Sequence, residues 1–204
     1  MEKILDGRTV FVSGAGSGIG RALALEFARN GARVACCGRR KERLDETVQL
    51  MESEAGKGLA IAADITDSIQ VKAAIEATRR DLGEIDLLFN NAGSFDSIAG
   101  VDEADAEVWW RDVEVNLRGS FLLIREVLPS MIARNSGIII NMDGGRPVGG
   151  SAYAAGKAGL MELGRVLNEE LKSQNSEVLI YSAGPGLVRT EICLLYTSPS
   201  PRDS

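Results

Sequence analysis

The chain has 204 residues, of which 45% are hydrophobic and 25% are charged, and this composition predicts one domain with a packed core and excludes wholesale disorder. The formal net charge of −6 argues against a nucleic-acid partner, because binding to phosphates requires a positive surface. The sequence has no apolar run of about 18 residues and no apolar stretch near Met1, so neither a membrane span nor a secretory signal is expected.

Apolar runs alternate with amphipathic stretches along the chain. The apolar runs predict strands at 8–13, 32–37, 59–63, 85–90, 137–141 and 178–182. The stretches with helical spacing predict helices at 20–30, 41–54, 68–82, 104–134 and 151–172. Near-continuous apolar strands separated by helices indicate a parallel sheet that is covered on both faces. We therefore predict an α/β fold with a doubly wound parallel sheet and the strand order 3-2-1-4-5-6.

The end of the chain breaks this pattern. Residues 193–204, CLLYTSPSPRDS, are rich in proline and serine and have no apolar period. They resemble the translated adapter or vector sequence found at the edge of DNA fragments, and the alternative is a genuine flexible tail. We expect an incomplete nucleotide-binding domain over residues 1–192 and a non-native tail over 193–204.

The numbers of cysteines and histidines limit the kinds of disulfide, catalytic and metal sites that the chain can form. The three cysteines are Cys36, Cys37 and Cys193, and an odd number with two neighbours in one strand is not a disulfide framework. A reducing, cytoplasmic location is therefore expected. The chain has no histidine, which excludes histidine-based triads and the commonest zinc sites, so no metal site is predicted.

A glycine-rich turn joins the first predicted strand to the first predicted helix. A dinucleotide pyrophosphate needs backbone N–H donors at a helix N-terminus and no side chains in its way. Gly14, Gly18 and Gly20 have the spacing G-x-x-x-G-x-G, which differs from the common G-x-G-x-x-G fingerprint. The turn is a predicted cofactor phosphate site, and the alternative is a tight strand-to-helix turn.

The end of the second predicted strand indicates which cofactor is used. NAD sites carry an acidic residue here that binds the adenosine ribose hydroxyls, whereas this chain has Gly38 followed by Arg39 and Arg40. Guanidinium groups suit a 2′-phosphate. We therefore expect NADP(H) to be preferred over NAD(H), with Arg39 as the first candidate for the 2′-phosphate ligand and Arg40 as the second. The alternative is that both arginines begin a solvated helix.

Tyr153 and Lys157 lie one turn apart on a predicted helix and share a face. A phenol has a pKa near 10, and a nearby ammonium lowers it by favouring the phenolate. Tyr153 could then act as general acid in carbonyl reduction and as general base in alcohol oxidation. Taken alone, such a pair is more often an ordinary face of an amphipathic helix.

Taken together, these motifs resemble the short-chain dehydrogenase/reductase family in order and nearly in spacing, over residues 1 to about 192. The resemblance implies a Rossmann-type fold whose last strand and substrate-covering loop lie beyond Thr190. The motifs that carry it are the glycine turn, Asp64, Asn91-Ala92-Gly93, Asn116, Tyr153 with Lys157, and Pro185-Gly186.

The resemblance also implies roles for individual residues. Tyr153 would be the catalytic acid/base, Lys157 would bind the nicotinamide ribose and activate the tyrosine, and Asn116 would hold a water in the proton relay. The implied cofactor contacts are Gly14, Ser17, Gly18, Ile19 and Gly20 at the phosphate turn, Asp64 and Ile65 at the adenine, Asn91, Ala92 and Gly93 at the riboses, and Pro185, Gly186, Val188 and Thr190 at the nicotinamide.

One departure concerns the serine that binds the substrate oxygen. The family reads Asn-x-Ser-Ser after the fifth strand, whereas this chain reads Asn-Met-Asp-Gly, so Gly144 stands in place of the serine and the segment to Tyr153 is short. Asp143 cannot donate to a carbonyl unless it is protonated. Ser151 is interpreted as a helix N-cap rather than as a substitute. Gly144→Ser is expected to raise activity if the shortened loop lets the hydroxyl reach the substrate.

Two functions follow from this sequence. The first is an oxidoreductase that transfers a hydride between NADP(H) and a small-molecule carbonyl or secondary alcohol. The second is a nucleotide-binding protein with little catalysis.

The family also implies a homodimer or homotetramer, which we expect to associate through the helices at 104–134 and 151–172. The candidate interface residues on the second helix are Leu160, Leu163, Leu167 and the small residues Ala154, Ala158 and Gly164. Alternatively, these residues only pack on their own sheet.

Overall fold

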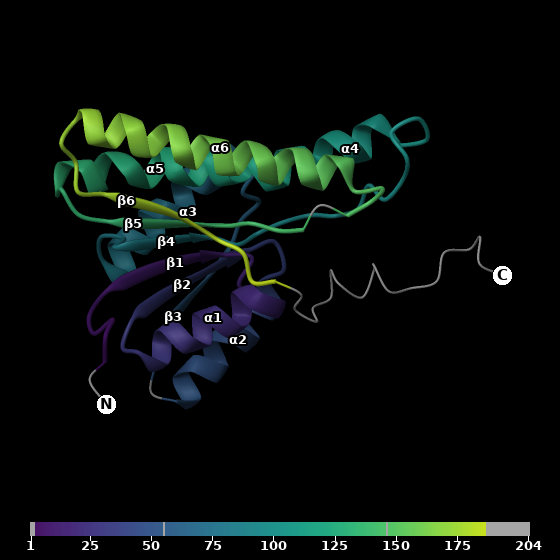
Figure 1. Cartoon of the computed structure of the whole chain (residues 1–204). Helices are drawn as coiled ribbons and strands as arrows, with labels where there is room; N and C mark the ends of the chain where they lie inside the picture. The colour runs from purple at the N-terminus through teal and green to yellow at the C-terminus, as the bar shows by residue number, and fades with distance from the viewer. Residues whose placement is uncertain (1–2, 55, 146, 187–204) are drawn as a thin grey trace.

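The structure is a computed structural model that describes residues 3–54, 56–145 and 147–186. Six parallel strands form one sheet in the order β3-β2-β1-β4-β5-β6 (Figure 1), which confirms the predicted strand order. The strands are β1 (Thr9–Ser13), β2 (Arg33–Gly38), β3 (Lys57–Ala62), β4 (Leu87–Asn90), β5 (Ile138–Met142) and β6 (Leu179–Ala183).

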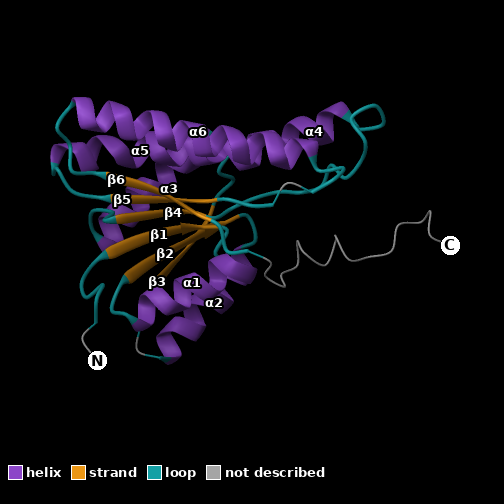
Figure 2. Cartoon of the chain, in the orientation of Figure 1, coloured by secondary structure: helices purple, strands orange, loops and turns teal. Residues whose placement is uncertain are grey.

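Helices cover both faces of the sheet (Figure 2). Helices α1 (Gly18–Arg29) and α2 (Lys41–Ser53) pack on one face, and α3 (Ser68–Leu82), α5 (Ser120–Ala133) and α6 (Ser151–Ser173) pack on the other. Strand β1 shows the alternation: Phe11 belongs to the core beneath α3, α5 and α6, whereas Val10 and Val12 belong to the core beneath α1 and α2. Because every central strand is buried on both sides, its sequence is a continuous apolar run.

The helix predicted at 104–134 is not uniform. It consists of α4 (Ala106–Val113), a π-helical segment η1 (Glu114–Gly119) and α5. A π-helix accommodates an extra residue in the turn and often occurs at functional sites. At its end, the backbone of Gly119 lies so close to Ile65 that an added Cβ would be 2.6 Å from the Ile65 Cδ1. This approach requires a glycine, and it joins the helix to the loop after β3.

The two described cysteines lie within β2 and are free thiols. Cys36 and Cys37 point to opposite faces of the sheet and both are fully buried. Burial raises the pKa of each thiol to about 12. None of the described helices is long and apolar enough to cross a membrane.

Candidate functional site

The turns that follow β1 and β4 are joined by side-chain hydrogen bonds. The Ser13 Oγ accepts from the backbone N–H groups of Asn91 and Ala92, both at 3.0 Å. The Asn91 Nδ2 in turn donates to the carbonyl oxygens of Ser13 at 3.0 Å and Gly14 at 3.3 Å. The glycine turn and the Asn91-Ala92-Gly93 segment therefore form one rigid edge at the carboxyl ends of the central strands.

Close packing explains two of the glycines in this turn. Gly14 has a φ of +69°, and an added Cβ would lie 2.8 Å from the Asn91 Nδ2. A Cβ on Gly20 would overlap the carbonyl oxygen of Gly14. These glycines are thus required by the protein itself, because α1 begins directly against the turn after β4.

The start of α1 fits an anionic ligand. Ser17 is the N-cap residue, but its side chain makes no capping hydrogen bond. The first N–H groups of the helix, on Gly18, Ile19 and Gly20, have no partner within the helix and can receive a phosphate. The Arg40 guanidinium lies beside this turn, with its Nη2 3.4 Å from the Ser17 Oγ.

The adjacent end of β2 is open and basic. Arg39 is exposed next to Arg40. A Cβ on Gly38 would meet only the Leu44 side chain, at 3.6 Å, so no close backbone packing demands a glycine there. Among the described residues, this corner carries guanidinium groups in the place where an acidic residue would hold ribose hydroxyls.

The loop after β3 holds Asp64 in a fixed turn. Its carboxylate accepts from the backbone N–H of Thr66 at 2.9 Å and from the Thr66 hydroxyl at 2.7 Å. The Ile65 side chain points into the core and packs against Gly119. An adenine contact by Ile65, as the resemblance implies, would therefore have to come from its backbone.

Tyr153 and Lys157 lie near the start of α6, against the end of β5. Lys157 is only 1% exposed, and its Nζ donates to the carbonyl oxygen of Met142 at 2.9 Å. The same Nζ lies 5.7 Å from the centroid of the Tyr153 ring. The ring of Phe95 stands edge-on to Tyr153, with the centroids 5.4 Å apart and the planes at 82°. The phenol is thus held between an aromatic edge and an ammonium group.

Asn116 completes this group from the π-helical segment. It is fully buried, and its Nδ2 donates to the carbonyl oxygens of Ser94 at 2.6 Å and Asp112 at 2.8 Å. Its Oδ1 is buried and has no hydrogen-bond partner among the described residues. A Cβ on Gly93 would lie 3.0 Å from this Oδ1 and 3.8 Å from the Lys157 Nζ. The fold therefore brings Asn116 and Lys157 together around Gly93.

Gly144 lies directly against the tyrosine. A Cβ at this position would overlap the Tyr153 hydroxyl and lie 2.6 Å from the Cζ of the ring. The backbone N–H of Gly144 donates to the Asp143 Oδ1 at 2.8 Å. The tyrosine hydroxyl thus occupies the space into which a serine side chain at 144 would extend.

The structure corrects the interpretation of Ser151. The N-cap of α6 is Gly150, and Ser151 is the first helical residue. Its Oγ accepts a hydrogen bond from the Trp109 Nε1 at 2.9 Å. The N-cap prediction was wrong because the N–H of Gly150 donates to the carbonyl oxygen of Pro147, and this tight turn makes Gly150 the N-cap, so the helix starts one residue earlier than an N-cap at Ser151 would allow.

The remaining predicted residues lie at the end of the described chain. Pro185 and Gly186 follow β6 and are exposed. Val188 and Thr190 lie outside the described residues, as does the predicted tail at 193–204.

Sequence reasoning missed Asp112. This residue is fully buried, and its carboxylate accepts from the Ser94 hydroxyl and from backbone N–H groups in the loop after Gly93. The available signal was its position four residues before Asn116, which places both residues on one face of a helix.

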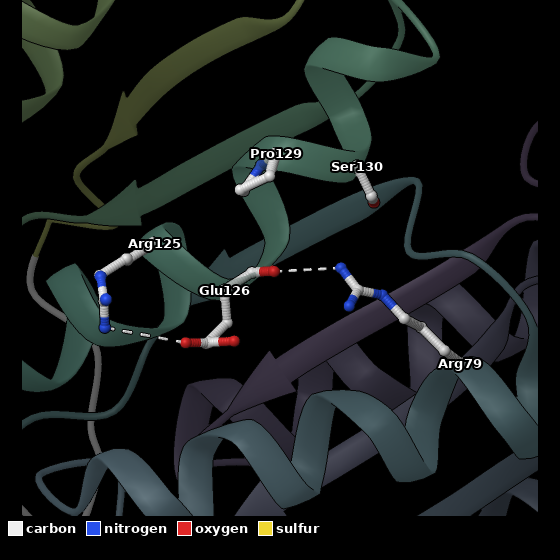
Figure 3. Close-up of a pocket in the computed structure, with 5 residues that line it drawn as sticks. All are labelled: Arg79, Arg125, Glu126, Pro129 and Ser130. Carbon is white, nitrogen blue, oxygen red and sulfur yellow. Dashed lines mark hydrogen bonds and ion pairs between the residues drawn. The ribbon is translucent and has the colours of Figure 1, made fainter.

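A hollow between α3 and α5 is separate from this site (Figure 3). Its polar groups already serve the protein, since the Arg79 Nη2 donates to the carbonyl oxygen of Glu126 at 3.0 Å and its guanidinium is paired with Glu84. The lining residues are Arg79, Arg125, Glu126, Pro129 and Ser130, and none is a predicted site residue.

Sequence comparisons agree with the geometry. The sequence profile of the short chain dehydrogenases matches residues 8–196. A short chain dehydrogenase from Pseudocercospora fijiensis is 39% identical over 194 residues, which cover 92% of this chain and 62% of the relative. A 3-oxoacyl-(acyl-carrier-protein) reductase from Thermotoga maritima is 35% identical over 191 residues, which cover 91% of this chain and 76% of the relative. The chain thus spans less than two thirds of the first relative.

Solved structures give the same result. A metagenomic short-chain oxidoreductase in complex with NADP matches with a TM-score of 0.84 and 32% identity, covering 91% of this chain and 85% of the other. A short chain dehydrogenase/reductase from Burkholderia phymatum in complex with NAD matches with a TM-score of 0.89 and 27% identity, covering 98% of this chain and 72% of the other. This chain belongs to the short-chain dehydrogenase/reductase family.

Proposed function

We propose that this protein is an NADP(H)-dependent oxidoreductase that interconverts a small-molecule carbonyl and a secondary alcohol. The observation that carries the proposal is that Asn116 and Lys157 converge around Gly93, with the Tyr153 ring beside the Lys157 Nζ, at the carboxyl ends of β4 and β5. Ligands of doubly wound sheets bind at this edge, where the strand order reverses.

The glycine turn and α1 would hold the cofactor. The N–H groups of Gly18 and Ile19 would bind its pyrophosphate, the turn at Asp64 would receive the adenine, and Gly93 would lie under the ribose next to the nicotinamide. When bound, the nicotinamide supplies or accepts the hydride. Pro185, Gly186, Val188 and Thr190 belong to the same proposal, at the nicotinamide end.

Tyr153 would act as the general acid/base that transfers the proton. In reduction its hydroxyl donates to the substrate oxygen, and the Lys157 ammonium beside the ring stabilises the phenolate that remains. The unpartnered Oδ1 of Asn116, facing the same space as the Lys157 Nζ, is a polar position suited to a water. Such a water would return a proton to the tyrosine.

The preference for NADP(H) is a proposal about the corner after β2. One structural relative is described with NADP and another with NAD, so the family uses both. In this chain Arg39 is exposed there, and Arg40 reaches the Ser17 hydroxyl at the phosphate turn. Both guanidinium groups are therefore candidates to bind a 2′-phosphate, and Arg40 is the one that reaches the phosphate turn.

The second candidate function is nucleotide binding with little catalysis. The observation that favours it is Gly144, which offers no side-chain donor to the oxygen on which charge develops. One assay separates the two functions. NADPH oxidation is followed with a panel of aldehydes and ketones, and NADPH binding is measured by fluorescence on the same protein. Turnover with any carbonyl supports the oxidoreductase, whereas tight binding without turnover supports the second function.

We propose a homodimer or homotetramer that associates through the helical layer. Two of the residues expected at the interface are not available for it. Leu160 is fully buried in the core, and Gly164 packs against Asn141 and Ile180, so these two serve the protein's own sheet. Exposed apolar side chains remain on α4, α5 and α6, namely Trp110, Phe121 and Val166.

The free thiols of β2 fit the proposed reducing, cytoplasmic location.

A further inference from the structure

We propose that Asp112 is a positioning residue for the catalytic site. Its buried carboxylate fixes the segment 94–97, and through it the orientation of Asn116 and the seat of the Tyr153 ring. The inference rests on the proposed function, because it assigns Asp112 a part in placing the groups that would transfer the proton.

The carboxylate of Asp112 is saturated by donors from one short loop. Its Oδ1 accepts from the Ser94 hydroxyl at 2.6 Å. Its Oδ2 accepts from the backbone N–H groups of Asp96 at 2.9 Å and Ser97 at 2.8 Å. No lysine or arginine of the described chain forms an ion pair with it. A buried carboxylate held only by neutral donors depends on each of these bonds, so the loop cannot move without a cost in free energy.

The same loop determines which way Asn116 faces. The Asn116 Nδ2 donates to the carbonyl oxygens of Ser94 and Asp112. Because both partners are acceptors, this end of the amide must be the nitrogen. The Oδ1 is therefore directed toward Gly93 and Lys157. The Ser94 hydroxyl lies 2.6 Å from the Asp112 Oδ1 and 2.9 Å from the Asp96 Oδ2. Its carbonyl accepts from Asn116, so Ser94 links the Asp112 carboxylate to the Asn116 amide.

The loop also contains Phe95, whose ring contacts Tyr153. Phe95 lies between Ser94 and Asp96, the two residues that Asp112 anchors. Its ring stands edge-on to Tyr153 and packs tightly against Gly150, the N-cap of α6. A shift of the loop would therefore move the aromatic edge against which the phenol is placed. Misplacement by about 1 Å in a reacting group can cost about 100-fold in rate.

The test compares Asp112→Asn with Asp105→Asn. Asparagine at 112 puts an NH₂ group where donors already converge, so the loop should loosen. Asp105 lies on the same helix and also accepts two backbone N–H bonds, from Glu107 and Val108, but it is exposed at the N-cap of α4. Asparagine is a good N-cap, so Asp105→Asn should match the parent within about twofold.

Four quantities are measured on each protein: kcat for carbonyl reduction and its pH profile, the Kd for NADPH, amide hydrogen exchange at Asp96 and Ser97, and the ionisation of the Tyr153 phenol. The last is obtained as the ultraviolet difference between each protein and its Tyr153→Phe counterpart. For Asp112→Asn we expect kcat to fall at least about tenfold, the pH profile and the phenol midpoint to shift together, amide protection to be lost, and the Kd to stay within about twofold.

Unchanged kcat, pH profile and phenol midpoint in Asp112→Asn would overturn the proposal. If the parent reduces no carbonyl, the proposed function fails, and the phenol midpoint and the exchange of the two amides still decide the role of Asp112. If Asp112→Asn does not fold, Ser94→Ala removes one of the carboxylate's contacts and keeps the others. A phenol midpoint identical to the parent's in that variant would overturn the proposal, and a shifted midpoint would support it.

Discussion

The hydroxyl of Tyr153 lies over the Cα of Gly144, in the space where a side chain at position 144 would begin. The glycine at 144, where the family has a serine, is therefore required by the position of Tyr153. Its missing side chain makes room for the Tyr153 phenol, which lies directly against the backbone of the segment between β5 and α6.

This contact reverses the expectation for Gly144→Ser. The sequence alone suggested a gain of activity, whereas the structure predicts that even the Cβ of alanine displaces the tyrosine. Gly144→Ala and Gly144→Ser should both lower kcat by about 100-fold. Gly145→Ala is the matched control, because nothing lies within 4 Å of a Cβ at that position. Higher turnover in Gly144→Ser would show that the tyrosine does not need this space.

Lys157→Ala should weaken both catalysis and the fold. The substitution leaves the carbonyl oxygen of Met142 buried without its donor, which costs about 1–3 kcal/mol in the free energy of unfolding. It also removes the proposed ribose contact, so the Kd for NADPH should rise at least about tenfold. Urea unfolding and fluorescence titration measure the two effects. Lys172→Ala, on the exposed part of the same helix, should change stability by less than about 0.5 kcal/mol, and equal effects of the two variants would contradict this account.

Cofactor preference can be tested at the corner after β2. Arg39→Ala and Arg40→Ala should each weaken NADPH binding by about tenfold, the loss of one charge-assisted hydrogen bond, and leave NADH binding nearly unchanged. Arg165→Ala, which removes an exposed guanidinium paired with Glu162 on α6, should alter neither. Equal affinity of the parent for NADPH and NADH would refute the preference.

The reactivity of the two β2 thiols tests whether this strand is buried. Cys36 and Cys37 should resist a disulfide reagent at pH 8 until the protein unfolds, because burial raises the pKa of each to about 12. Since the folded state keeps these protons longer than the unfolded chain, stability should fall as the pH rises above about 8.5. The measurement uses the Cys193→Ser protein, so that only these two thiols are counted. Rapid labelling in the native protein would contradict the buried position of β2.

The fold was predictable because it depends on patterns that every strand and helix repeats. Alternating apolar runs and amphipathic stretches indicate a parallel sheet covered on both faces, and the glycine turn after the first strand favours the strand order 3-2-1-4-5-6 among doubly wound sheets. The i,i+4 spacing likewise places Tyr153 and Lys157 on one helical face.

The details of the site depend on distances between segments far apart in sequence, which no local pattern encodes. The overlap of a side chain at 144 with Tyr153 is a contact between the end of β5 and the start of α6 that the sequence spacing does not reveal. The carboxylate of Asp112 acquires its role only when the loop after β4 folds onto α4. Ser151 was misassigned because the turn between Pro147 and Gly150 makes Gly150 the N-cap, and the Ser151 hydroxyl instead accepts from the indole of Trp109 on another helix.

The central claim is that Tyr153 carries the proton, and Tyr153→Phe tests it most directly. Phenylalanine keeps the ring that packs edge-on against Phe95 and removes only the hydroxyl. The measurement is the rate of NADPH oxidation with a reducible carbonyl, beside the Kd for NADPH, in the parent and the variant. The account predicts that turnover is abolished while the Kd stays within about twofold, since the substitution removes the proton donor and little else. Turnover equal to that of the parent would contradict the account.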